Sequence, residues 1–95
     1  MIMILFRWNA EKNEIFARER GITFEEIVQR IESGGKVIET DHPNKAKYPN
    51  QKILIIDMEG YAYLVPCVID KNDYFLKTII PSRKATKKYF GGEDG

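Results

Sequence analysis

The residues best suited to chemistry lie near the C-terminus, between Ile79 and Tyr89. An apolar, strand-favouring run leads there into a basic cluster that contains an aromatic residue, and between Lys77 and Tyr89 there are five basic residues and no acidic one. Guanidinium, ammonium and hydroxyl groups bind phosphate, and a preceding strand would hold their backbone in a fixed direction. The sequence therefore predicts an anion site, and nucleic acid is the ligand it favours.

Net charge does not test this prediction, because fifteen basic and fourteen acidic residues leave a formal charge of only +1. The placement of the charges is more informative. Acidic residues such as Glu25, Glu26 and Glu32 lie in the N-terminal half, away from the basic cluster. The alternative is that the cluster is a solvated basic tail with no ligand.

His42 is the only histidine, so it is the only side chain whose unperturbed pKa lies close to neutrality. Its place beside Pro43 in a polar loop favours a surface residue, and acid–base catalysis is the alternative. Cys67 stands alone in an apolar run, which indicates a small core residue and excludes a disulfide framework. No glycine-rich phosphate loop, paired cysteines or nucleophile elbow is present, so we expect no metal and no cofactor.

Three aromatic residues offer a choice between packing and base stacking. Trp8, between Arg7 and Asn9, either packs in the core or stacks on a base. Tyr61 and Tyr63 alternate along the chain and so share one face of a strand. That face is either a stacking platform or the half-exposed side of an ordinary sheet.

The length of 95 residues fits a single domain covering residues 1–95, and a hydrophobic content of 43% is typical of a globular protein. Neither a signal-peptide apolar region nor a membrane-spanning run of about 18 residues is present. We therefore expect a cytoplasmic protein that has no membrane partner.

The N-terminal part is predicted to form a short strand and two helices, over Met1–Trp8, Ala10–Arg20 and a stretch from Thr23 to Ser33. Asn9 is a good N-cap and Gly21 a good C-cap for the first helix. Thr23 and Glu26 match the capping box that opens the second.

After Gly35 the pattern changes to strands, predicted over 36–40, 52–57, 61–69 and 74–80, with a loop at 41–50 and a tight turn at Glu59 and Gly60. Pro66 requires an edge position or a bulge in its strand. The predicted fold class is α+β, with two N-terminal helices packed on an antiparallel sheet of about four strands and a short N-terminal strand.

Two separated segments carry a resemblance to a known family. Residues 6–13 (FRWNAEKN) with 20–26 (RGITFEE) resemble the N-terminal signature of the BrnT toxins, and residues 79–87 (IIPSRKATK) resemble that family's C-terminal element. The sequence departs from the family pattern at Asn9, at 19–21 and at Lys52, which stands where many relatives have arginine. It is therefore similar to a divergent member.

The resemblance implies a RelE-like fold and a metal-independent endoribonuclease, the toxin of a type II toxin–antitoxin pair. The implied partners are an RNA substrate and a cognate DNA-binding antitoxin protein. In such an enzyme the 2′-hydroxyl of RNA attacks the adjacent phosphorus. Arg83 is the best candidate to clamp the phosphate, Lys52 and Lys84 would add charge, and His42 or Tyr89 would complete the acid–base pair.

The expected RNA contacts are aromatic or basic side chains, namely Arg7, Trp8, Tyr61, Tyr63, Lys87 and Lys88. The competing interpretation is a binding module without catalysis, whose basic C-terminal surface holds nucleic acid or an acidic protein. A third interpretation, compatible with the first, makes the same surface the docking site of the antitoxin.

Overall fold

The computed structural model describes residues 3–91, and these form an α+β fold. The elements in chain order are β1 (Leu5–Trp8), α1 (Ala10–Arg20), α2 (Phe24–Glu32), β2 (Val37–Asp41), β3 (Gln51–Met58), β4 (Tyr61–Asp70), β5 (Asp73–Leu76), β6 (Ile80–Pro81) and α3 (Arg83–Ala85), which continues into the π-helical turn η1 (Thr86–Phe90). Within the described residues no helix is long and apolar enough to cross a bilayer.

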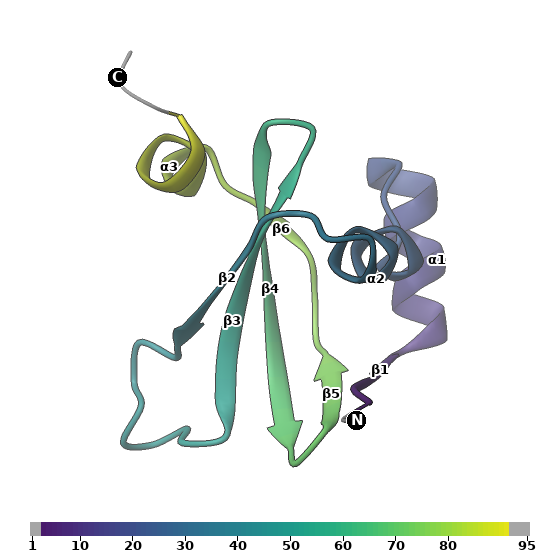
Figure 1. Ribbon diagram of the computed structural model, residues 1–95. Coiled ribbons are helices and arrows are strands. Elements are labelled where there is room, and N and C mark those ends of the chain that lie inside the picture. The colour runs from purple at the N-terminus through teal and green to yellow at the C-terminus, as the bar shows by residue number, and fades with distance from the viewer. Residues whose placement is uncertain (1–2, 92–95) are drawn as a thin grey trace.

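The strands form one twisted sheet in the order β1-β5-β4-β3-β2, and β6 pairs with β4 beside β5. Only β1 and β5 are parallel, whereas the other pairs are antiparallel. Helices α1 and α2 cover one face, and α3 lies on the opposite face (Figure 1). The predicted α+β fold with two N-terminal helices is confirmed. The sheet has six strands instead of about four, because β1 joins it and the last predicted strand is divided, and it is mixed because β1 pairs in parallel.

The last predicted strand, 74–80, is divided into β5 and β6, and Pro66 lies opposite the interruption. β4 pairs with β6 through Tyr63 and Leu64 and with β5 from Cys67 onward. Between these two stretches β4 has no strand partner on that side. Pro66 therefore lies at a local edge, where its missing N–H costs no ladder hydrogen bond. The carbonyl of Pro66 still accepts the Lys77 N–H at 2.8 Å.

Both helices begin and end as their sequences predict. The Asn9 side chain accepts the Lys12 N–H at 2.9 Å, and Gly21 takes the left-handed conformation with φ 68°. Thr23 and Glu26 form both bonds of the capping box. These interactions are local, which is why the sequence is enough to predict them.

The main core lies between the two helices and the sheet, where Phe24, Ile27, Ile56, Val65 and Leu76 are fully buried. A smaller apolar cluster lies on the other face of the sheet. It joins buried Ile55, Ala62 and Ala85 to the half-buried rings of Tyr89 and Phe90. The C-terminal helical segment is therefore packed against the sheet rather than extended as a tail.

Helix α1 has little apolar surface and is joined to α2 by a buried polar residue. The Asn13 side-chain oxygen accepts the Phe24 N–H at 2.7 Å, and its amide donates to Glu25 Oε1 at 2.6 Å. Phe16 supplies the main apolar contact, against the Phe24 ring. Asn13 and Phe16 thus join α1 to α2, and α1 is also tied to the chain after β5 by the bonds from Lys12 to the Lys77 carbonyl and from Arg20 to the Ile79 carbonyl.

Candidate functional site

The C-terminal helical segment is held to β4 by the backbone N–H of Ser82 and the hydroxyl of Thr86. Ser82 donates its N–H to the Ala62 carbonyl at 3.0 Å, and its Oγ accepts the Ala85 N–H at 3.0 Å. Thr86 Oγ1 accepts the Ala62 N–H at 2.8 Å and donates to the Ser82 carbonyl at 2.7 Å. This network fixes the direction in which the following side chains leave the sheet.

The outer side of this segment carries four exposed cations, which we call the basic segment: Arg83, Lys84, Lys87 and Lys88. Their spacing places them on one side of the helical turns, while Ala85, Tyr89 and Phe90 face the sheet. Within residues 3–91 none of the four forms an ion pair. The fifth predicted site residue on this segment is Tyr89, whose ring centroid lies 5.2 Å from the Lys88 ammonium. The structure thus brings five predicted site residues together.

Lys52 does not belong to this group. It shares the helix-covered face of β3 with Leu54, and its ammonium bonds to Asp41 at 2.8 Å and lies 3.9 Å from Glu39. The hydrogen bond between Lys52 and Asp41 lowers the pKa of the Asp41 carboxyl and raises the pKa of Lys52. Its charge is neutralised on the face opposite the basic segment.

His42 is also remote from Arg83. It follows β2, where its N–H bonds to the Gln51 carbonyl, and its Nδ1 accepts the Asn44 N–H at 2.9 Å. The loop between β2 and β3 and the segment α3 lie at opposite ends of the sheet (Figure 1). Lys52 is remote from Arg83 as well. Ser82 bonds to Ala62, which pairs with Asp57 of β3, and Lys52 lies five residues away from Asp57, or about 17 Å along the strand.

Trp8 and Arg7 point to opposite faces of β1. The Trp8 ring stacks on Phe24 with centroids 5.8 Å apart, so its main contact is with the core. Arg7 pairs with Asp73, with Nε 3.1 Å from Oδ1, and this hydrogen bond raises the pKa of Arg7. Both residues lie at the β1 edge, apart from the basic segment.

Tyr61 and Tyr63 share one face of β4, as predicted, with ring centroids 5.8 Å apart. That face is the one covered by α1 and α2, so neither ring lies over the inner side of α3. Tyr63 pairs with Pro81 in the sheet and is therefore close in the fold to the start of the basic segment.

Cys67 is fully buried, which confirms that it is a core residue. Burial raises the pKa of its thiol to about 11. Among the described residues no three His, Cys, Asp or Glu side chains are grouped as a metal site.

Sequence reasoning missed three basic residues that the structure places near predicted ones. The Lys36 ammonium lies 5.6 Å from the Phe90 ring centroid, beside the basic segment. Arg20 and Arg30 line a cavity together with Tyr63. The sequence does place Arg20 and Arg30 in the last turns of α1 and α2. That position is only a weak indication of a ligand site, because basic residues there usually interact with the helix dipole.

No family model, curated protein or solved structure matches this chain. What the structure itself defines is an α+β fold that presents a cationic surface on the basic segment.

Proposed function

We propose that this protein binds RNA on the basic segment and cleaves it as a metal-independent endoribonuclease, the toxin of a type II toxin–antitoxin pair. The observation that carries the proposal is the group of four exposed cations at Arg83, Lys84, Lys87 and Lys88, which have no ion-pair partner within residues 3–91. An unneutralised cationic surface attracts a polyanion, and a backbone held by Ser82 and Thr86 keeps it preorganised.

The resemblance to the BrnT toxins supports the same proposal. Residues 20–26 form the junction of α1 and α2, and the Ser-Arg-Lys-Ala-Thr run forms the start of the basic segment. In that run Ser82 and Thr86 hold the backbone while Arg83 and Lys84 face solvent. Two anchoring residues thus flank the two cations to which the proposal assigns phosphate binding.

In the proposed reaction the 2′-hydroxyl gives up its proton and its oxygen attacks the neighbouring phosphorus, while the bond from that phosphorus to the 5′-oxygen of the next nucleotide breaks. The products are a 2′,3′-cyclic phosphate and a 5′-hydroxyl, whose oxygen takes up a proton as it leaves. Arg83 binds two nonbridging oxygens with its planar fork, and Lys84 adds charge as the transition state forms. Tyr89 is the predicted acid–base group that lies on the same segment. His42 and Lys52 take no part in this step, because they lie at the other end of the sheet.

The test is expression from a tightly repressed promoter in bacteria, with growth and transcript integrity as readouts. We expect the wild-type chain to arrest growth and cut RNA, and Arg83→Ala to lower the cleavage rate about a hundred- to a thousandfold. Arg18→Ala, an exposed arginine on α1, is the matched control and should behave as wild type. Full toxicity of Arg83→Ala would exclude this role for Arg83.

The remoteness of His42 and Lys52 from Arg83 favours a second candidate, a binding module without catalysis. In that case RNA or an acidic protein binds the basic segment and leaves intact. Arg83→Lys separates the two candidates, because lysine keeps the charge but loses the bidentate geometry. An enzyme should lose cleavage in this variant, whereas a binding module should retain its affinity.

The proposed antitoxin partner would dock on the same surface, since covering the basic segment blocks access to RNA. Co-purification with the product of a neighbouring gene for a small DNA-binding protein, lost when all four cations are replaced, tests this proposal.

A further inference from the structure

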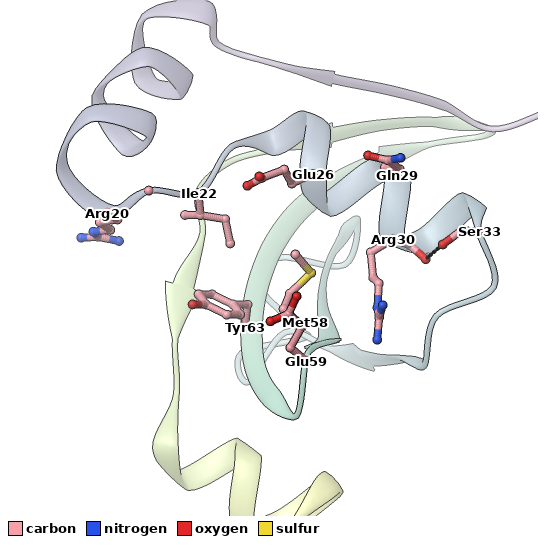
Figure 2. Close-up of a pocket in the computed structure, with 10 residues that line it drawn as sticks. Arg20, Ile22, Glu26, Gln29, Arg30, Ser33, Met58, Glu59 and Tyr63 are labelled. Atoms are coloured by element: carbon pink, nitrogen blue, oxygen red, sulfur yellow. Dashed lines mark hydrogen bonds between the residues drawn. The ribbon is translucent and has the colours of Figure 1, made fainter.

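A cavity of about 450 Å³ opens between α2 and the hairpin that joins β3 to β4. Figure 2 shows Arg20 and Arg30 toward its two ends, Glu26 on the helix side, and Met58, Glu59 and Tyr63 on the hairpin side. The volume lies within the range that holds one small organic molecule. None of the predicted site residues except Tyr63 lines it.

Both arginines are anchored by backbone carbonyls and keep donors for a ligand. Arg20 Nη1 donates to the Ile79 carbonyl at 2.9 Å, and its guanidinium lies 5.0 Å from the Phe16 ring centroid. Arg30 Nε donates to the Asp57 carbonyl at 2.8 Å. A guanidinium has five N–H donors, so each of these anchors leaves several free to bind acceptors.

The carboxylates balance this charge. Glu26 Oε1 accepts the Thr23 N–H at 3.1 Å, which fixes the carboxylate while Oε2 stays available. Glu59 sits at the hairpin turn and forms no ion pair within residues 3–91. Two cations and two anions disfavour a ligand with a large charge of either sign at this position. They suit a neutral ligand that carries both donors and acceptors.

The apolar residues that line the cavity favour a flat ligand. The half-buried Tyr63 ring and the Met58 thioether offer surfaces against which a flat aromatic ring can pack. Single-stranded RNA is commonly read in this way, with an unstacked base against an aromatic side chain and polar groups on its edges.

We propose that this cavity binds a guanine base of the RNA strand whose phosphates lie on the basic segment, an inference that rests on the proposed RNA function. The Watson–Crick edge of guanine presents two neighbouring N–H donors to one carboxylate, and its O6 and N7 accept from a guanidinium. Cytosine, uracil and adenine lack this combination. Tyr63 pairs directly with Pro81, which precedes Ser82 and Arg83, so one strand can reach both sites around β6.

Isothermal titration calorimetry of the purified chain with GMP, AMP, CMP and UMP measures the four affinities and tests the inference. We expect GMP to bind at least about tenfold more tightly than the other three, and a variant with both Glu26→Gln and Glu59→Gln to lose about tenfold or more of its GMP affinity. Glutamine at 26 keeps an oxygen for the Thr23 N–H, so the helix cap survives. Glu14→Gln, on exposed α1 surface, is the matched control.

Equal affinity for the four nucleotides, absence of GMP binding, or unchanged GMP binding in the double variant would overturn the inference. RNA cleavage and binding are measured on the same preparations. Cleavage without guanine preference would refute the cavity alone, whereas GMP preference without RNA binding would refute the proposed RNA function and leave a nucleotide site.

Discussion

At the scale of single residues, Asn13 is the buried polar side chain on which the position of α1 depends. Asn13→Ala removes the acceptor of the buried Phe24 N–H and the donor to Glu25. We expect the free energy of unfolding to fall by about 1–3 kcal/mol, because a buried donor is left without a partner. Urea denaturation measures this, with the exposed Glu14→Ala as control. A loss below about 0.5 kcal/mol would show that Phe16, with the bonds of Lys12 and Arg20, holds α1 without Asn13.

Cys67 gives a second prediction at this scale. Burial raises the pKa of its thiol from 9.0 to about 11, so the folded protein retains a proton that the unfolded chain releases. The associated stability is fully present below pH 9 and is lost as the pH rises through 11. Relative to Cys67→Val, which does not titrate, the wild-type free energy of unfolding should fall by about 2 kcal/mol between pH 8 and pH 10.5.

Denaturation of both proteins at the two pH values measures that difference. Thiol alkylation at pH 8 gives an independent readout, since the buried thiol should react only when the protein unfolds. A parallel pH profile for wild type and variant would show that Cys67 ionises normally in the fold.

At the scale of elements, the docking of the basic segment depends on the Thr86 hydroxyl. Thr86→Val keeps the shape but removes the bonds to the Ala62 N–H and the Ser82 carbonyl. We expect local opening of residues 82–90 to become easier by about 1–3 kcal/mol, with faster amide exchange there. The proposed RNA cleavage should weaken with it.

Thr86→Ser is the matched control, because it retains the hydroxyl while losing only a methyl group. If amide exchange in Thr86→Val stays as slow as in wild type, the apolar contacts of Tyr89 and Phe90 are sufficient to hold the segment.

At the scale of the whole molecule, the net charge of +1 conceals a polarised surface. If each of the four cations of the basic segment contacts one phosphate of single-stranded RNA, the logarithm of the binding constant should fall with log salt concentration with a slope of about −3. Fluorescence anisotropy with oligouridine measures this slope without a guanine base. Lys87→Ala should make the slope shallower by about 0.7, and Arg18→Ala should not change it. A slope near zero in wild type would rule out phosphate binding on the basic segment.

The helix ends, the tight turn at Glu59 and Gly60 and the buried Cys67 could all be predicted from the sequence. Each depends on residues a few positions apart, or on a side chain's preference for apolar surroundings. The basic cluster was visible for the same reason, because its cations are neighbours in the chain.

What the tertiary structure decided is which distant residues meet. Lys52 was expected beside Arg83, but strand register and the alternation of side chains place it on the other face, paired with Asp41. Arg20, Arg30 and Tyr63 line one cavity only because α2 packs beside the β3–β4 hairpin. Such proximity depends on long-range packing, for which a single sequence carries no local signal.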